Sequence, residues 1–414
     1  MAVIKPFNAL RPRAELASKV ASRPYDVLSS REAREEARDN PYSFYHVSKS
    51  EIDLPENVDV HDKKVYEKAK ENLDSLIRQQ IFYLENKPCY YIYKLVMHDV
   101  SQTGLVCVSS VTDYENGVIK KHELTRPEKE KDRINHILTT GAQTGNVFLA
   151  YHSVNEIDSL INQWQASHAP VYEFMSMDHI QHSIWVINED KMIAQITDLF
   201  SEKVPFTYIA DGHHRAASAA KAAKELKDRE KEKDNDAAEF FLTTLFPDNQ
   251  LRILDYNRVV MDLNGKDKAA FLSDLGYDFT VTPIGKTIVK PAEMHEFGMY
   301  LDGEWYRLVA KAGTYKTDPI GILDVTILQN NVLDKWLGIK DPRTDKRIDF
   351  VGGIRGPEEL VKRVDSGEMK VAFALYPVSM QQLFDIADQG QVMPPKSTWF
   401  EPKLRDGLLT HLIL

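Results

Sequence analysis

The chain has 414 residues, of which 43% are hydrophobic, 28% charged and 10% aromatic, and its formal net charge is −10. The length permits a large buried core and predicts two or three units. The acidic balance argues against nucleic acid as the main partner, because gripping a phosphate backbone needs a surplus of Lys and Arg on at least one face. The densest charged run, Lys224 to Glu239, alternates in sign and is typical of a solvated helix face.

Membrane and disulfide signals are absent from the sequence. No run of 18 apolar residues is present, and the start, MAVIKPFNALRPRAELA, lacks the apolar core of a signal peptide. Cys89 and Cys107 are the only cysteines, and each lies in an apolar run typical of a strand. This pattern argues against a disulfide framework or a Cys-based zinc site. We therefore expect a cytoplasmic protein without a membrane partner.

The first 130 residues mix helix and strand signals. Ser29 or Ser30 begins a capped helix, and apolar residues at helical spacing over 65–84 predict one long amphipathic helix. CYYIYKLVM and GLVCVSSV are two predicted strands joined by a polar turn. Thr125 and Glu128 then form the capping box of a further helix, with Pro127 in its first turn.

Strands and helices continue to alternate along the rest of the chain. NVFLAY, VYEFM, HSIWVI and FTYIA are predicted strands, and AASAAKAAKELK is a strong helix former. FGMYLDGEWYRLVA is a hairpin that turns at Asp302-Gly303, and ILDVTILQNNVLDKWLG is a helix. This mixture predicts an α+β (mixed α/β) fold. We expect an N-terminal region of residues 1–250 and a C-terminal region of residues 251–414 that packs against it.

The stretch FTYIADGHHRAASAA concentrates polar groups between a predicted strand and a predicted helix. Asp211, Gly212, His213, His214 and Arg215 fill this gap, where free backbone N–H groups at the helix N-terminus favour an anion. An ordinary N-cap explains Asp211 alone, but positive charges are unfavourable at this end of a helix unless an anion compensates them. The pattern favours a phosphate site. A zinc site is the weaker alternative, because no HExxH pattern accompanies the two histidines.

A second charged cluster lies in KKHELTRPEKEKDR. An exposed charged helix is its simplest explanation, and the functional alternative is that His122, Glu123 and Arg133 face one pocket. RPYDVLS adds Tyr25 and Asp26 in a rigid segment, which a well-packed turn explains equally well.

Two C-terminal stretches offer further phosphate ligands. In MPPKSTWFEPK, Lys396, Ser397 and Thr398 supply one positive charge and two hydroxyls, but the glycines of a Walker A loop are missing, so this is not a P-loop. FVGGIRG places Arg355 beside glycines that permit close approach of a ligand. Neither pattern is specific on its own.

Several of these motifs carry a family resemblance. IKPFNALRP, PYDVLS, HELTRPEKEKDR, IADGHHRAASA, LDYNRVV and MPPKSTWFEPKLRDGL identify the chain as a member of a large bacterial family, domain of unknown function family 1015. The DGHHR turn resembles the phosphate-gripping turn of the ParB/sulfiredoxin-like fold, which sulfiredoxins and free-serine kinases use. The resemblance implies a ParB/sulfiredoxin-like core elaborated by hairpins and a C-terminal α/β region. It also implies that Gly212, His213, His214 and Arg215 hold phosphate, with Asp211 as metal ligand or base.

The chain also differs from known members of that fold, and these differences reduce the number of activities to consider. The turn has no cysteine, which excludes sulfiredoxin chemistry, and the chain shows neither the helix-turn-helix module nor the basic surface of ParB. We expect a phosphotransferase that acts on a small hydroxyl metabolite, first of all L-serine or O-phosphoserine, with Mg²⁺ and with ATP, ADP or pyrophosphate as donor. In this hypothesis Asp211, His213 and Glu123 are catalytic, and Lys396, Ser397 and Thr398 close over the phosphate.

Alternative functions use the same turn. One is a phosphoserine phosphatase, and another is a non-catalytic regulator that binds a nucleotide or phosphometabolite. A nucleic-acid protein or nuclease is disfavoured by the acidic charge. We expect small-molecule partners and no nucleic acid, and a homodimer is one assembly to test.

Overall fold

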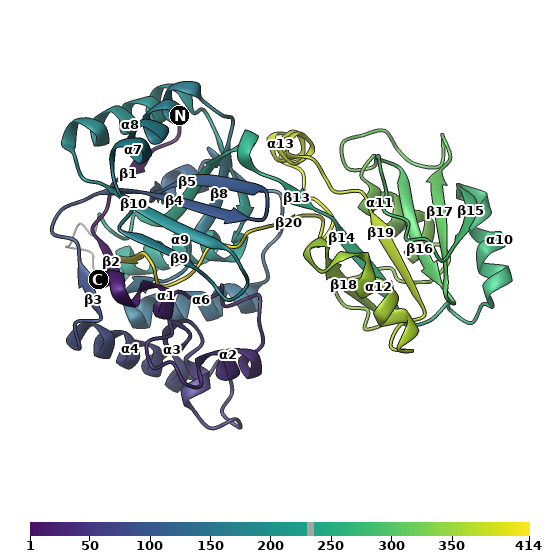
Figure 1. Ribbon diagram of the computed structural model, residues 1–414, viewed down its shortest axis with the longest axis horizontal. Coiled ribbons are helices and arrows are strands. Elements are labelled where there is room, and N and C mark those ends of the chain that lie inside the picture. The colour runs from purple at the N-terminus through teal and green to yellow at the C-terminus, as the bar shows by residue number, and fades with distance from the viewer. Residues whose placement is uncertain (230–235) are drawn as a thin grey trace. The chain divides into compact units, whose positions relative to one another are not determined.

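The computed structural model describes residues 1–229 and 236–414 and divides the chain into two compact units. Unit 1 comprises Met1–Leu251 and Pro402–Leu414, and unit 2 comprises Arg252–Glu401 (Figure 1). The expected C-terminal region of residues 251–414 differs from unit 2, because the end of the chain returns to unit 1, where β21 (Thr410–Leu412) pairs with β2 (Ala9–Pro12). Both units combine helices and sheets, so the mixed α/β class predicted from the sequence is confirmed.

In the described part of the chain, a nine-stranded mixed sheet forms the centre of unit 1. Its strands are, in spatial order, β6 (Ile119–Lys120), β11 (Thr207–Asp211), β8 (Val147–Tyr151), β12 (Phe240–Pro247), β5 (Val100–Ser110), β4 (Tyr90–Met97), β10 (Gln181–Ile187) and β9 (Tyr172–Met175), with β1 (Ile4–Lys5) paired to β5. β11 is parallel to β6 and antiparallel to β8. The ends of β6 and β11 and the start of β8 therefore lie at one edge of the sheet.

Helices cover the sheet on both sides. Those of unit 1 are α1 (Ala17–Val20), α2 (Ser30–Ala37), α3 (Tyr45–Ser48), α4 (Lys63–Arg78), α5 (Val111–Glu115), α6 (Pro127–Thr140), α7 (Asn155–Ser167), α8 (Asp190–Lys203) and α9 (His213–Arg229). In Figure 1, α7 and α8 lie beyond one side of the sheet, and α2, α3, α4 and α6 beyond the other. Leu149 and Ile209 from the sheet, Phe200 from α8 and Ala216 from α9 belong to one buried apolar cluster.

A second sheet corrects the prediction of one long helix over 65–84. α4 ends at Arg78, and Gln80 takes a left-handed conformation with φ of 57°. The chain then forms β3 (Phe82–Leu84) in a four-stranded sheet of order β3, β2, β21 and β7 (Ala142–Gln143), as far as the described residues show. Apolar spacing cannot distinguish the end of a helix from a short strand that follows it directly.

The helix starts differ in how well the sequence predicted them. Ser29, one of the two serines predicted to begin this helix, caps α2, and Glu32 completes a capping box with it. The capping box expected at Thr125 is wrong, because α6 begins at Pro127 and Thr125 donates its hydroxyl hydrogen bond to Glu130 instead. Of the charged run 224–239, α9 carries the part up to Arg229, and residues 230–235 lie outside the described residues.

Unit 2 is built on a six-stranded sheet within the described ranges. Its order is β15 (Phe279–Gly285), β17 (Glu304–Ala310), β16 (Glu296–Leu301), β19 (Val371–Leu375), β14 (Tyr256–Val260) and β18 (Ile348–Gly352). β13 (Ile253–Leu254) pairs with β20 (Trp399–Phe400), and the helices are α10 (Lys268–Asp278), α11 (Asp324–Leu328), α12 (Gly356–Asp365) and α13 (Met380–Asp388). The predicted hairpin at Asp302-Gly303 is confirmed by β16 and β17.

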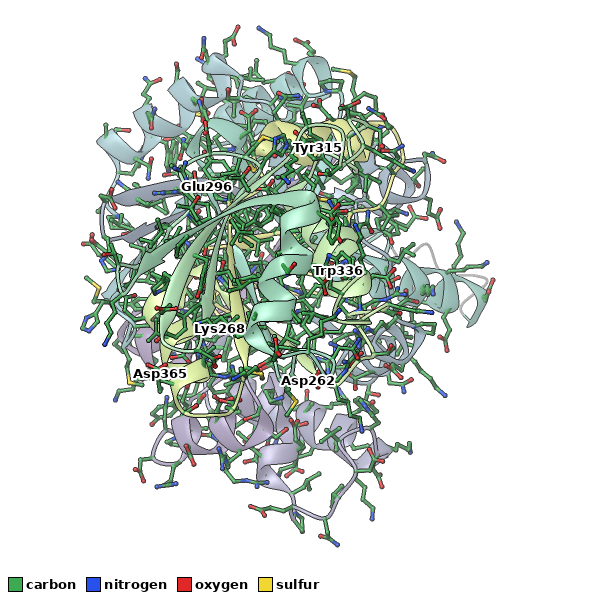
Figure 2. All side chains as sticks on the ribbon, turned by 90° about the vertical axis from the view of Figure 1, so that its right-hand side faces the viewer. Asp262, Lys268, Glu296, Tyr315, Trp336 and Asp365 are labelled. Carbon is green, nitrogen blue, oxygen red and sulfur yellow. The ribbon has the colours of Figure 1, made fainter. Side chains whose placement is uncertain are left out.

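The helix predicted for ILDVTILQNNVLDKWLG is correct only in its first part. After α11 the chain continues as a π-helix, η4 (Gln329–Asp334). π-Helical turns are rare and occur often at functional sites. Figure 2 shows the side chains on the face of unit 2 that carries Tyr315 and Trp336. Across residues 1–229 and 236–414, no helix is long and apolar enough to span a membrane.

Candidate functional site

The connection between β11 and α9 consists of Gly212 alone, since the strand ends at Asp211 and the helix begins at His213. Gly212 has φ of +95°, a left-handed conformation that favours glycine. A Cβ atom at this position would lie 3.1 Å from Nε of Arg215. Glycine therefore lets the backbone pass directly over the guanidinium, which places Arg215 beside the unpaired N–H groups that begin a 17-residue helix.

Arg215 is buried at this turn, with 8% of its surface exposed. Its Nη1 donates to the carbonyl of Asn146, which precedes β8, and its Nη2 lies 3.5 Å from Asp211 Oδ2 and 3.9 Å from Asp26 Oδ2. Its Nε and Nη2 atoms have no hydrogen-bond partner among the described residues. These two nitrogens form one edge of the planar guanidinium, so a buried pair of donors suited to a bidentate anion is left unused.

The charge of Arg215 is maintained by its acidic neighbours. Burial alone would lower the pKa of Arg215, but Asp26, Asp211 and Asp406 together raise it above its ordinary value. The guanidinium therefore stays charged although it is buried.

The two histidines of the turn are held as neutral donors. Nε2 of His214 accepts the backbone N–H of Arg126 at 3.0 Å, and Nε2 of His213 accepts that of His122 at 3.5 Å. In the neutral rings, the proton therefore lies on Nδ1. Burial lowers the pKa of His213 to about 3 and also lowers the pKa of His214. Both side chains offer an N–H group near neutral pH without adding a charge.

His122 and Glu123 reach the turn from the end of β6. The rings of His122 and His213 meet edge to face with centroids 4.5 Å apart, and Glu123 Oε2 lies 3.9 Å from His213 Nδ1. Burial lowers the pKa of His122 to about 3. Within the described part of the chain, neither ring nitrogen of His122 has a hydrogen-bond partner. The parallel pairing of β6 with β11 explains why these distant segments meet.

Asp211 is an ionised carboxylate paired with two cations. Lys403 Nζ lies 3.1 Å from Asp211 Oδ2, and Arg215 Nη2 lies 3.5 Å from the same oxygen. Burial by itself raises the pKa of Asp211, but Lys403 and Arg215 outweigh burial and lower it below its ordinary value. No group of three or more His, Cys, Asp or Glu side chains in the described ranges is arranged to hold a metal ion. Asp211 is therefore an ion-pair partner of Lys403 and Arg215, and its role as a Mg²⁺ ligand stays a prediction.

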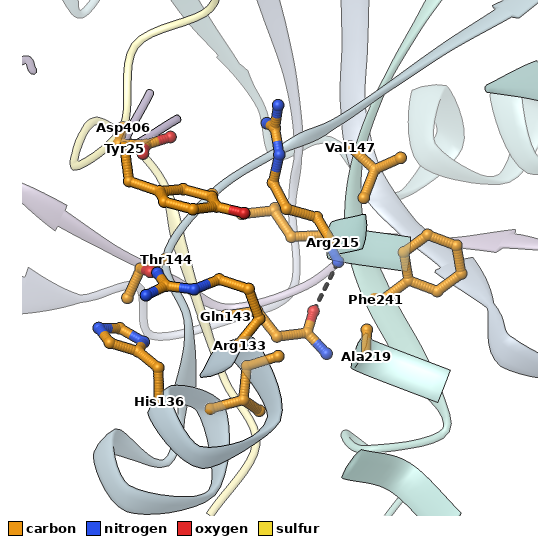
Figure 3. Close-up of a pocket in the computed structure, with 13 residues that line it drawn as sticks. Tyr25, Arg133, His136, Gln143, Thr144, Val147, Arg215, Ala219, Phe241 and Asp406 are labelled. Carbon is orange, nitrogen blue, oxygen red and sulfur yellow. Dashed lines mark hydrogen bonds between the residues drawn. The ribbon is translucent and has the colours of Figure 1, made fainter. Parts of the chain in front are cut away.

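A small cavity of about 30 Å³ lies beside Arg215 (Figure 3). Arg133 and Tyr25 both line it, and the Arg133 guanidinium carbon lies 4.1 Å from the centre of the Tyr25 ring. Figure 3 shows the Tyr25 ring between the side chains of Arg133 and Arg215. Asp406 lines the same cavity, and burial raises its pKa to about 7. The cavity has room for about one water molecule, or for one small polar group of a ligand.

The residues expected from the C-terminal motifs lie in unit 2. Ser397 is buried, and its hydroxyl donates to the carbonyl of Pro394 at 2.7 Å. Lys396 has φ of 60°, and its carbonyl accepts from Arg258 Nη2 at 2.9 Å. Thr398 follows in the same loop, and Arg355 lies in a short 3₁₀ turn after β18. The role of these side chains as phosphate ligands stays a prediction.

Three residues at the turn were missed from the sequence: Asn146, Lys403 and Asp406. Lys403 and Asp406 belong to PKLRDG, which overlaps the end of MPPKSTWFEPK, but the sequence analysis assigned phosphate ligands only to Lys396, Ser397 and Thr398. This segment is anchored by Arg405, which forms an ion pair with Asp178 at 2.5 Å. The alternation of Lys, Arg and Asp in a short loop was the available signal. The carbonyl of Asn146 leaves no signal, because every residue has one.

The chain matches one protein family and is distantly similar to several solved structures. Residues 4–326 match the family model described as "Protein of unknown function (DUF1015)", and no curated protein matches the chain. Among solved structures, the chain is similar to a free serine kinase in complex with AMP, with 10% identity and a TM-score of 0.35 over 73% of this chain and 91% of that chain. It is similar to a conserved hypothetical protein from Pyrococcus furiosus (13% identity, TM-score 0.34, covering 73% and 93%). It is also similar to C-terminally truncated SbnI from Staphylococcus aureus (10%, 0.37, 73% and 85%). Similarities this distant assign neither ligand nor activity.

Proposed function

The chain belongs to this family, whose description names no activity, and we propose that it is a phosphotransferase whose phosphate site is the turn from Asp211 to Arg215. The observation that carries the proposal is the unpaired edge of Arg215. Its Nε and Nη2 are buried at the N-terminus of α9 and have no hydrogen-bond partner among the described residues. Buried donors in native proteins are nearly always satisfied, so an unpaired pair of them calls for a ligand or ordered water. A phosphate oxygen pair fits the fork and the adjoining N–H groups of the helix.

The two histidines of the turn provide further hydrogen-bond donors for a bound anion. The Nδ1–H groups of His213 and His214 are donors fixed by the backbone contacts of their Nε2 atoms. Two neutral donors and one permanent cation bind a phosphate without placing several like charges at the helix end. Positioning and charge neutralisation are the main contributions that a protein makes to phosphoryl transfer.

We assign the general base to Glu123. A base in this reaction takes the proton of the acceptor hydroxyl while the hydroxyl oxygen forms a bond to phosphorus and the bond from phosphorus to the leaving group breaks. Asp211 is a poor candidate, because its lowered pKa makes it a weak proton acceptor. Glu123 is within 3.9 Å of His213 and carries a partly exposed side chain, so an acceptor can reach it. In this scheme Asp211 orients Arg215, and Lys403 neutralises Asp211.

Mg²⁺ enters the proposal with the phosphate donor. Magnesium bound at nucleotide phosphates usually takes one or two protein carboxylates and otherwise phosphate and water oxygens. It would neutralise charge on the transferred group. No protein ligand is assigned to it here, because Lys403 and Arg215 already pair with Asp211.

The proposed acceptor is L-serine, and O-phosphoserine is the product or the reverse substrate. The choice of serine is based on the resemblance of the DGHHR turn to that of free-serine kinases. The test is phosphorus NMR of the whole chain with L-serine and ATP, ADP or pyrophosphate, and with O-phosphoserine alone, each with and without Mg²⁺. New phosphoserine establishes the kinase and its donor. Phosphate released from phosphoserine establishes a phosphatase on the same site. No turnover in any sample, with binding that depends on Arg215, establishes a phosphate-binding regulator instead.

A further inference from the structure

Unit 2 contains a pocket that the proposed function does not use. Its volume is about 420 Å³, which is within the range of small-molecule binding sites. All of its lining comes from unit 2, namely from the segment 313–321, from α11 and from the π-helix η4. Tyr315, one of the lining residues, is labelled in Figure 2.

The wall of this pocket is held in place without a ligand. Asn331 Nδ2 on η4 donates to the carbonyl of Thr314 at 3.0 Å. The hydroxyl of Tyr315 lies 3.0 Å from His295 Nδ1, and His295 Nε2 lies 3.3 Å from the carbonyl of Ile322. Because a carbonyl only accepts, Nε2 of the neutral ring carries the proton and Tyr315 donates to Nδ1. The lone pairs of the Tyr315 oxygen are therefore left to accept from a ligand.

One cationic and one anionic side chain, Lys316 and Asp318, line the pocket. A Cβ atom on Gly321 would lie 2.6 Å from Lys316 Cβ and 2.7 Å from Asp318 Oδ2, so the base of the Lys316 side chain and the carboxylate of Asp318 both lie beside this glycine. Asp318 accepts the N–H of Gly321 at 3.0 Å through its other oxygen. Across the described residues, neither Lys316 nor Asp318 takes part in an ion pair, although both line the pocket. One cation and one anion at adjacent positions match the carboxylate and the ammonium of a single zwitterion.

The remaining lining is neutral and mostly polar. Thr326 lines the pocket, and its hydroxyl oxygen is buried without a hydrogen-bond partner in the described part of the molecule. Asn330 adds an amide, and Ile320 and Ile327 add apolar surface. These groups fit a polar side chain with a short apolar stem. We propose that unit 2 carries a second ligand site, which binds an amino acid with its carboxylate on Lys316 and its ammonium on Asp318.

The test is calorimetric titration of the whole chain with a panel of proteinogenic L-amino acids, and with nucleosides as a second class. We expect at least one amino acid to bind. Lys316→Met and Asp318→Asn should each weaken it about tenfold or more, the scale of losing one charge-assisted contact. Thr326→Val, which keeps the shape of the side chain, should weaken it by a smaller factor. Lys290→Met is the matched control, because Lys290 is exposed in the same unit but does not line the pocket, and it should leave the affinity unchanged.

Arg215→Ala separates this site from the proposed phosphate site. Amino-acid binding that persists in Arg215→Ala belongs to unit 2 even if no phosphoryl transfer is ever found. The proposal is overturned if no amino acid binds, if only nucleosides bind, if Lys316→Met and Asp318→Asn bind as tightly as the parent chain, or if Arg215→Ala abolishes binding. Far-UV circular dichroism and thermal unfolding of each variant show that a loss of binding is not a loss of folding.

Discussion

The sequence predicts phosphate ligands in two segments of this chain, the turn 211–215 in unit 1 and the loop 396–398 in unit 2, and the two segments use their donors differently. At the turn, Arg215 keeps two buried nitrogens without a hydrogen-bond partner among the described residues. In the loop, the Ser397 hydroxyl is already bound to a carbonyl at 2.7 Å, and Lys396 Nζ lies over the Tyr256 ring, 5.6 Å from its centre. Cationic and hydroxyl side chains therefore do not indicate a ligand site by themselves. The better indication is a buried donor that has no hydrogen-bond partner within the fold.

The largest effect should come from Arg215 itself. Arg215→Ala is expected to lower the rate of phosphoryl transfer, or the affinity for pyrophosphate, roughly 10²–10³-fold, by analogy with the loss of one preorganised donor in an oxyanion site. Arg215→Lys keeps the charge but loses the fork, so it should recover only part of the loss. Calorimetric titration with pyrophosphate measures both variants. An Arg215→Ala chain that is folded and fully active would remove the basis of the proposed site.

Lys403 and Lys396 provide a direct test of the difference between the turn 211–215 and the loop 396–398. Lys403→Met removes a cation 3.1 Å from Asp211 and should weaken pyrophosphate binding about tenfold, because Asp211 is then free to compete with the anion for Arg215. Lys396→Met, seven positions earlier in the sequence, should change the affinity by less than about twofold. A tenfold loss of pyrophosphate affinity in Lys396→Met would instead support the site expected from the sequence, in which Lys396 closes over the phosphate.

Gly212 tests whether the close approach to Arg215 matters. Gly212→Ala places a methyl group 3.1 Å from Arg215 Nε and should cost about 1–2 kcal/mol of unfolding free energy for the left-handed backbone, in addition to displacing the guanidinium. Gly117→Ala is the matched control, because Gly117 has φ of +75° and nothing within 4 Å of an added Cβ. Both variants should lose similar backbone stability in urea unfolding, but only Gly212→Ala should lose pyrophosphate binding. Equal pyrophosphate binding by the two variants would show that the close approach of Gly212 to Arg215 does not matter for binding.

The smallest effect concerns pH. Asp406 has a pKa raised by burial to about 7, and the charged groups that act on it are Arg215, Asp26, Arg133 and Arg405. Its charge appears as the pH rises through 7 and opposes an anion at Arg215, so sulfate affinity should be highest below pH 7 and fall a few-fold above it. Asp406→Asn should flatten this dependence. The histidines should contribute no step near pH 6, because burial lowers the pKa of His122 and of His213 to about 3. A step near pH 6 that survives in Asp406→Asn would contradict the neutral state of these rings.

Much of the fold could be predicted from local signals, and part of the site could not. The strand and helix around Gly212 follow from apolar and alanine-rich runs, and the sequence also offers the alternative that His122, Glu123 and Arg133 face one pocket. The short strand Phe82–Leu84 was missed because its apolar residues continue the spacing of α4. Lys403 and Asp406 were missed because they reach the turn only through a C-terminal segment that returns to unit 1, a long-range contact that no local pattern encodes.

The most direct test is a crystal structure of the chain with pyrophosphate. We expect density for a phosphoryl group at the N-terminus of α9, with oxygens at hydrogen-bond distance, about 2.7–3.2 Å, from Nε and Nη2 of Arg215. The Nδ1 atoms of His213 and His214 should face the same group. Pyrophosphate bound elsewhere, with the Arg215 edge occupied by ordered water or by Asp26, would contradict the central claim that this turn is the phosphate site.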